Sequence, residues 1–188
     1  RRVLFRSISS PDVNLVRQVF MGLVDKLPAN NATSDFIPAL GEYWPGQGGI
    51  NGGPVPARGD VPAHYLIFAA KDVGDHEYGG RGDESGATSK WDGLANTKEL
   101  LIEGGHPAAE ACAVYTADGH SDFYLGAAAE MYQAWVNAPE SFDKDAWYQT
   151  STQRSADFAY VMHFDGGNQG YDFKGTERRV RPVRRLFI

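Results

Sequence analysis

The side chains that could carry catalysis are few and lie far apart in the sequence. Cys112 is the only cysteine, and the five histidines are His64, His76, His106, His120 and His163. No HExxH, GxSxG or close Cys/His pattern connects them, so the sequence indicates neither a metallohydrolase nor a serine or cysteine hydrolase. A single cysteine also excludes an intrachain disulfide and a CxxC redox pair. We therefore expect no enzymatic activity and no catalytic residues.

Two acidic stretches are the candidates for metal binding. One holds Asp72, Asp75 and Glu77, and the other holds Asp83 and Glu84. Carboxylate oxygens suit hard cations such as Ca²⁺, but neither spacing matches a calcium-binding loop. We expect solvated acidic loops, with no metal and no cofactor.

Five arginines near the end of the chain could contact phosphate or an anionic glycan. They are Arg178, Arg179, Arg181, Arg184 and Arg185. The formal net charge is −6 and the pI is about 5.3, which argues against a surface built to bind nucleic acid. Because these arginines alternate along a closing strand, we expect them to pair with the acidic excess instead.

The composition indicates one sizeable core in a loop-rich fold. The chain has 188 residues, of which 42% are hydrophobic and 12% aromatic, with 22 glycines. Such a composition favours aromatic side chains packed between short strands over a helical bundle. No apolar stretch approaches the roughly 18 residues that a membrane-spanning helix needs, and there is no secretory leader. We expect a soluble domain without membrane insertion and without an export signal in this fragment.

The N-terminal part divides into two short segments. Residues 1–7 resemble the translation of a sequencing-adapter oligonucleotide, so we exclude them from the fold. Ser10-Pro11-Asp12 is typical of a helix start, and a helix over 11–27 is expected, followed by a linker, within an N-terminal segment 8–42. Its apolar residues step by three and four, which fits either an oligomerisation stalk that forms a homo-oligomer such as a trimer, or a helix that packs on its own domain.

The middle of the chain alternates irregular stretches with short elements. We expect irregular structure over 37–50, a buried strand over 64–70 and an exposed loop over 74–89. His106-Pro107 opens a helix that buries Cys112. A further helix over 127–137 is expected to direct Met131, Tyr132 and Trp135 inward.

From residue 146 onward the apolar pattern has a period of two, which predicts strands. Phe158, Tyr160, Met162 and Phe164 alternate with smaller or polar residues, and a hairpin turn is expected over 165–168. The chain then returns over 171–174, and a final strand should run over 179–187. Pro182 interrupts that strand and indicates a bulge or an edge position.

The order of several motifs resembles the DUF1566 family, also called the Lcl C-terminal domain. The motifs are Tyr43-Trp44-Pro45-Gly46-Gln47-Gly48-Gly49, His64-Tyr65-Leu66, Trp91-Asp92-Gly93-Leu94-Ala95-Asn96-Thr97, His106-Pro107-Ala108-Ala109-Glu110, Gly119-His120-Ser121-Asp122-Phe123-Tyr124-Leu125, Trp147-Tyr148-Gln149-Thr150-Ser151-Thr152 and Arg179-Val180-Arg181-Pro182-Val183-Arg184-Arg185. The resemblance covers residues 43–188 and implies an α+β, C-type-lectin-like (formylglycine-generating-enzyme-like) fold. The chain departs from the family pattern at Gln149-Thr150, where members usually have Trp-Ser, and at Leu125-Gly126, where they have Leu-Pro.

The resemblance implies that the C-terminal strands form a ligand-facing surface, which retroelement-driven mutagenesis diversifies in some relatives. Tyrosine combined with asparagine, aspartate and small residues suits an adaptable binding surface. The corresponding segment runs from Tyr148 to Lys174, and we expect ligand-binding side chains, exposed or in loops, at Tyr148, Thr150, Asp157, His163, Asn168, Tyr171, Asp172, Phe173 and Lys174.

The expected function is ligand recognition, by a receptor-binding or adhesion protein of a phage or prophage tail or of a bacterial surface. Its partner would be a host cell-surface protein or glycan. A virion assembly protein that binds another protein is the alternative. A diverged enzyme of the formylglycine-generating fold is a third reading, and the single Cys112 argues against it because that chemistry depends on cysteines.

Overall fold

The structure, a computed structural model, describes residues 37–188. Within that range the chain is α+β, as the sequence predicts, with short strands around three helices. The helix expected over 11–27 and the linker after it lie outside the described residues. The elements are, in chain order, β1 (Tyr43–Trp44), β2 (Gly49–Val55), β3 (His64–Ala69), β4 (Asp75–His76), α2 (Gly93–Glu103), α3 (Pro107–Ala113), β5 (Tyr124–Leu125), α4 (Ala128–Asn137), the 3₁₀ turn η1 (Pro139–Ser141), β6 (Trp147–Gln153), β7 (Phe158–His163), β8 (Asn168–Phe173), β9 (Arg178–Arg179) and β10 (Pro182–Phe187).

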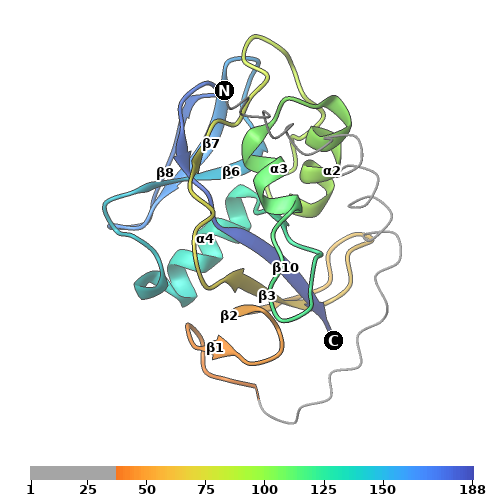
Figure 1. Ribbon diagram of the computed structural model, residues 1–188, viewed down its shortest axis with the longest axis vertical. Coiled ribbons are helices and arrows are strands. Elements are labelled where there is room, and N and C mark those ends of the chain that lie inside the picture. The colour runs from red at the N-terminus through yellow and green to blue at the C-terminus, as the bar shows by residue number, and fades with distance from the viewer. Residues whose placement is uncertain (1–36) are drawn as a thin grey trace, which may run out of the picture.

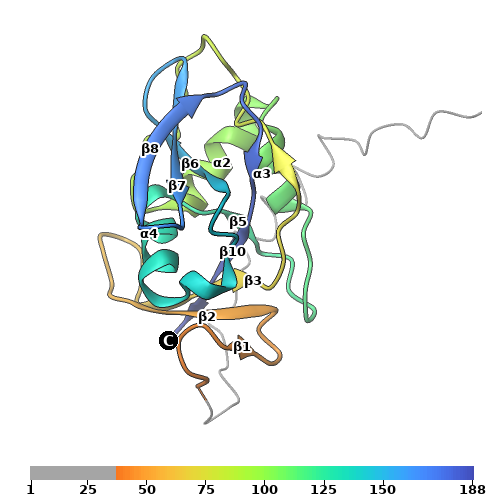
Figure 2. The same ribbon diagram turned by 90° about the vertical axis from the view of Figure 1, so that its left-hand side faces the viewer.

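The described strands form two five-stranded sheets. The first has the order β1-β2-β3-β10-β5, and the second has the order β4-β9-β6-β7-β8. Neighbouring strands are antiparallel except β6 and β9, which are parallel. Figure 1 shows β6, β7 and β8 above β1, β2 and β3, with α2 and α3 side by side next to them. In Figure 2, α4 lies between the two sheets, where it contacts β2 on one side and β6 and β7 on the other.

The main core fills the space between the two sheets. Its buried side chains come from β3, β5, β10, α4 and the second sheet, and include Leu66, Tyr124, Met131, Tyr148 and Phe164. Cys112 is fully buried in a second cluster under α3, which confirms its expected core position. Tyr132 was expected to face inward, but it is 45% exposed, because α4 buries the face that carries Met131 and Ala134.

Two further expectations about local structure are wrong. The stretch 37–50 is not irregular throughout, because β1 and the start of β2 pair within it, and Gly46 and Gly48 adopt positive φ in the turn that joins them. The loop over 74–89 is not wholly exposed, since Tyr78 and Ala87 are buried. The other regular elements expected between residues 64 and 137 are present.

The end of the chain forms two strands instead of the single strand expected over 179–187. Arg178–Arg179 pairs in the second sheet, whereas β10 begins at Pro182 and lies between β3 and β5 in the first. Pro182 is therefore neither at a bulge nor on an edge strand. A proline can occupy the first residue of a central strand, where its missing N–H does least harm. No helix among residues 37–188 has the length and apolar character to cross a membrane.

Candidate binding face

An aromatic ladder covers one face of the β7–β8 hairpin. Phe158 pairs with Phe173 and Tyr160 with Tyr171 across the two strands, so all four side chains lie on the same face. The Phe158 and Phe173 rings stack with centroids 4.6 Å apart. Tyr171 is 52% exposed and Phe173 is 44% exposed, so two neighbouring rings of β8 present apolar area to solvent.

The ladder is open to solvent because α4 covers only the other end of the hairpin. There Met162 is buried, and the Gln169 side chain donates to the carbonyl of Ala128 at 2.8 Å. Beyond that point three cations lie over the rings. The hairpin therefore presents preformed aromatic area on a rigid strand pair.

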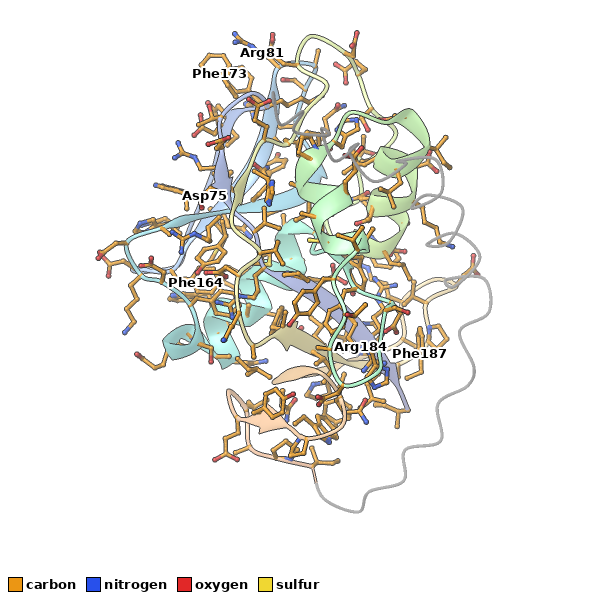
Figure 3. All side chains as sticks on the ribbon, in the orientation of Figure 1. Asp75, Arg81, Phe164, Phe173, Arg184 and Phe187 are labelled. Carbon is orange, nitrogen blue, oxygen red and sulfur yellow. The ribbon has the colours of Figure 1, made fainter. Side chains whose placement is uncertain are left out.

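Three cationic side chains lie over these rings. The Arg154 guanidinium is 3.8 Å from the centroid of Tyr171, that of Arg81 is 4.6 Å from Phe173, and the Lys90 ammonium is 5.5 Å from Tyr160. Figure 3 shows Arg81 beside Phe173 at one end of the molecule. At exposed sites such contacts contribute about 0.5–1 kcal/mol each. We call the surface made by these seven residues the aromatic face: Phe158, Tyr160, Tyr171, Phe173, Arg81, Lys90 and Arg154.

A buried lysine holds the loop that carries Arg81. The Lys174 ammonium donates to the carbonyl of Asp83 at 2.6 Å and to the side-chain oxygen of Gln153 at 2.6 Å, with a longer contact to the carbonyl of Gly80 at 3.4 Å. Burial lowers the pKa of Lys174 below its usual value. Lys174 thus connects the loop to the end of β6 and positions Arg81 without facing a ligand.

The structure separates the nine residues predicted for ligand binding. Tyr171 and Phe173 lie on the aromatic face, and exposed Asp157 lies at its rim, 3.6 Å from Arg81. Tyr148, Thr150 and Lys174 are buried, so the expectation that these side chains are exposed is wrong.

The burial of Tyr148 and Thr150 follows from the position of β6. This strand lies inside the second sheet, between β9 and β7, and packs against the core. The Tyr148 hydroxyl donates to Asp72 and accepts from the amide of Asp143, and burial raises the pKa of Tyr148 to about 12. Thr150 donates to the carbonyl of Tyr160 at 2.8 Å.

His163, Asn168 and Asp172 occupy the opposite parity on the hairpin, away from the aromatic ladder. The His163 ring lies 4.9 Å from the ring of Trp147. Asp172 is held by Arg178, whose Nε donates to it at 2.9 Å. These residues therefore do not join Tyr171 and Phe173 in one surface.

Five residues of the aromatic face were not among the predicted ligand contacts: Phe158, Tyr160, Arg81, Lys90 and Arg154. The period-two alternation was a signal for Phe158 and Tyr160, because strands of a hairpin place residues of matching parity on one face. Arg81 and Lys90 come from a loop that lies far earlier in the chain than the rings they contact, and local sequence carries no signal for that approach.

The β10 arginines pair with acids, as expected from the charge balance. Arg181 binds Asp72, Arg184 binds Asp122 at 2.9 Å, and Arg185 binds both Asp92 at 2.9 Å and Glu130 at 3.0 Å. These three arginines are buried, and the one buried nitrogen among them without a hydrogen-bond partner in residues 37–188 is Arg185 Nε. Among residues 37–188, no group of three or more His, Cys, Asp or Glu side chains is placed to hold a metal ion.

Comparison with protein families finds no family model that matches the chain, and no curated protein matches it either. The functional argument therefore rests on the geometry of the aromatic face. That face gathers four aromatic rings and three cations in one place, and the hydrogen bonds of buried Lys174 hold the loop that carries Arg81.

Proposed function

We propose that this chain is a non-catalytic ligand-recognition module and that the aromatic face is its binding surface. The observation that carries the proposal is the ladder of four aromatic rings, of which Tyr171 and Phe173 are exposed and Phe158 and Tyr160 half-buried, with three cations over it. Aromatic side chains supply large contact areas at low entropic cost, and arginine adds directional hydrogen bonds, so both are enriched where proteins bind. A ring that already packs against a guanidinium is partly ordered, so it loses little conformational entropy when a ligand covers it.

The α+β architecture supports a C-type-lectin-like domain of the kind the DUF1566 resemblance implies. On that reading, the C-terminal hairpin would be the ligand-facing segment. Its exposed rings on β8, Tyr171 and Phe173, can change without disturbing the core, because neither belongs to a buried core cluster. This property suits a segment that is diversified in some relatives.

The biological role that fits best is receptor binding or adhesion, in a phage or prophage tail or on a bacterial surface. The partner would be a host cell-surface glycan or protein. Sugar rings place apolar C–H faces on aromatic side chains, while their hydroxyl groups accept hydrogen bonds from arginine. We therefore favour a glycan as the first ligand class to test.

The test is a glycan array that carries bacterial surface polysaccharides, probed with the labelled full chain. We expect binding that is lost in Tyr171→Ala and in Phe173→Ala, since each change removes exposed ring area. Tyr43→Ala is the matched control, because Tyr43 is an equally exposed tyrosine, at 45%, on a strand of the other sheet. Circular dichroism would show that the three variants remain folded.

Loss of binding in both hairpin variants, with binding kept in the control, would support the adhesin. Equal binding by all three variants would place the site elsewhere and overturn the proposal. An array without any bound glycan would also overturn the adhesin proposal for glycans and favour the alternative, a virion protein that binds another protein.

A further inference from the structure

The three cations of the aromatic face lie over adjacent rings and are open to solvent. Tyr171 pairs with Tyr160 across the hairpin and is two residues from Phe173 on the same face, and each of these rings has one cation over it. The exposed cations are Arg81, Lys90 and Arg154. Figure 3 shows Arg81 and Phe173 at the outer edge of the molecule. A ligand in solution can therefore reach rings and cations together.

Two of these cations have no acidic partner. Arg154 and Lys90 have no carboxylate at ion-pair distance among residues 37–188, and the Arg154 side chain makes no hydrogen bond there. Arg184 and Arg185 on β10, by contrast, are each held by an aspartate at 2.9 Å. On a chain with a net charge of −6, two unpaired cations over paired rings form a local site for negative charge.

The third cation has only a loose partner. Arg81 Nε lies 3.6 Å from the carboxylate of Asp157, and both side chains are more than half exposed, at 57% and 53%. An exposed ion pair of this kind contributes little to stability, so a ligand carboxylate can take the place of Asp157. Asp83 and Glu84 on the adjoining loop lie near the buried ammonium of Lys174, which offsets their charge. The exposed surface therefore keeps an excess of positive charge.

The contact between Arg154 and Tyr171 offers a charged group and an apolar group side by side. The guanidinium lies 3.8 Å from the ring centroid. An arginine over a ring keeps its N–H groups in its own plane, where two of them can donate parallel hydrogen bonds to one carboxylate. With Arg154 in place, Tyr171 is still 52% exposed, so ring area remains for the apolar C–H face of a sugar.

We propose that the ligand of the aromatic face is an acidic glycan, in which a sugar packs on Tyr171 and Phe173 while its carboxylate binds Arg154. This inference rests on the proposed function, because it names the ligand class of the same site. A single-stranded nucleic acid also combines flat rings with negative charge, but its site covers at least about four nucleotides, each with a phosphate. Two unpaired cations on an acidic chain match a glycan with one or two carboxylates better than such a strand.

The experiment is a calorimetric titration of the full chain with two acidic sugars and with their methyl esters. The acids are digalacturonic acid and sialyllactose, and each ester keeps the sugar but removes the charge. We expect an acid to bind about tenfold more tightly than its ester, the effect of one charge-assisted hydrogen-bonded pair. Raising the NaCl concentration from about 50 to about 500 mM should weaken binding of the acid and leave that of the ester unchanged.

One variant removes the charge and leaves the rings. Arg154→Gln should lower the affinity for the acid to that for the ester, with ester binding unchanged. Arg58→Gln is the matched control, because Arg58 is also an exposed arginine over a ring, 4.8 Å from Trp91, and has no carboxylate at ion-pair distance among residues 37–188. It lies outside the aromatic face and changes the net charge by the same amount, so it should leave the affinity for the acid unchanged.

A second variant should strengthen binding. Asp157→Asn removes the carboxylate that competes for Arg81, so we expect the acid to bind about threefold more tightly and the ester to bind as before. Asp60→Asn, at an exposed aspartate on the loop between β2 and β3, makes the same change in net charge and is the control. A gain confined to Asp157→Asn is a result that a merely structural role for the ion pair would not produce.

The outcomes separate this inference from the proposed function. Equal affinity for acid and ester, or equal effects of Arg154→Gln and Arg58→Gln, would overturn the acidic ligand, while a Tyr171→Ala variant that loses both sugars would still support a glycan site. Absence of binding by both acids on a chain that binds a neutral glycan on the array would overturn this inference alone. Tighter binding of a single-stranded oligothymidylate than of either acid would overturn it in favour of a nucleic acid.

Discussion

The ammonium group of Lys174 lies 2.6 Å from the side-chain oxygen of Gln153, in the interior beneath the loop that carries Arg81. Gln153 in turn donates to the carboxylate of Glu84 at 2.6 Å, and the other oxygen of Glu84 accepts from the amide of Ala156. The loop and the turn between β6 and β7 are therefore joined through one buried cation. This network holds the two segments that carry Arg81 and Arg154.

Replacement of Lys174 by methionine tests that network. Lys174→Met keeps the length of the side chain but removes the ammonium that donates to the carbonyl of Asp83, and it leaves the Gln153 oxygen with the Ser85 amide as its remaining donor. We expect the free energy of unfolding to fall by about 3 kcal/mol, the usual scale for breaking a buried charged hydrogen bond. Urea denaturation measures it. Lys144→Met, which removes an exposed lysine paired with Glu140, is the control and should change stability by less than about 0.5 kcal/mol. Similar values for the two variants would contradict a structural role for Lys174.

The first residue of α2 has no room for a side chain. A Cβ on Gly93 would lie 2.3 Å from Glu130 Oε2, 2.5 Å from the amide nitrogen of Ala127 and 2.7 Å from the carbonyl of Leu125. Glu130 Oε2 accepts from both the Gly93 and Ala127 amides, at 3.1 Å and 2.8 Å, so it cannot move without breaking them.

We therefore expect Gly93→Ala to destabilise the protein by about 2–3 kcal/mol, although alanine is the better helix former. Thermal and urea unfolding both measure the effect. Gly175→Ala is the matched control, because the nearest atom to its added Cβ would be 3.8 Å away. A neutral or stabilising effect at Gly93 would show that the α2 start and Glu130 are not packed as described.

Local periodicity was enough to predict several elements but not how they pair. Alternation identified β7 and the turn after it, and His106-Pro107 identified the start of α3. The burial of Tyr148 depends on the position of β6 beside β9, a two-residue strand about thirty residues away that pairs with β6 in parallel at Tyr148. The exposure of Tyr171 and Phe173 depends on the position of α4, which covers only the other end of the hairpin. Both are tertiary facts that a period of two does not encode.

Charge patterning was more informative than motif matching for the C-terminal arginines. The acidic balance predicted that they would be paired, and Arg184 and Arg185 are buried against Asp122 and Glu130. A buried guanidinium needs an acidic partner, so an acidic chain with several arginines in one strand is expected to form buried ion pairs. The identity of each acid came only from the fold.

Cys112 should be unreactive while the protein is folded. Its thiol is fully buried under α3, and burial raises its pKa, so the thiolate that reacts with disulfide reagents is scarce. Ellman's reagent at pH 8 should label the native protein only after urea is added. A Cys112→Ser, Val114→Cys double variant moves the thiol to a position that is 53% exposed and should react at once. Rapid labelling of the unmodified chain would refute the buried position.

Two buried histidines predict how stability depends on pH. Desolvation by burial lowers the pKa of His64, and the positive charge of Arg185 lowers it further. The hydrogen bond to the carbonyl of Pro62 acts in the opposite direction. Desolvation likewise lowers the pKa of His106, whose Nδ1 contacts the carbonyl of Tyr78, although Glu103 and Glu110 act in the opposite direction. Each histidine therefore binds a proton more weakly in the folded chain than in the unfolded chain, where the pKa is near 6.5.

Because the unfolded chain binds more protons, the stability that these histidines contribute is fully present above about pH 7 and is lost as the pH falls through 6.5 toward their folded values. The loss is at most about 1.4 kcal/mol for each histidine for each pH unit. Urea unfolding at pH 7.5 and pH 6.0 measures it. We expect the unmodified chain to be less stable at pH 6.0, and His106→Phe to show a smaller difference between the two pH values because one of the two protons is no longer taken up on unfolding. Equal stability at both pH values, or greater stability at pH 6.0, would contradict this prediction. It would mean that His64 and His106 bind protons as readily in the folded chain as in the unfolded chain, and so are not buried as neutral side chains.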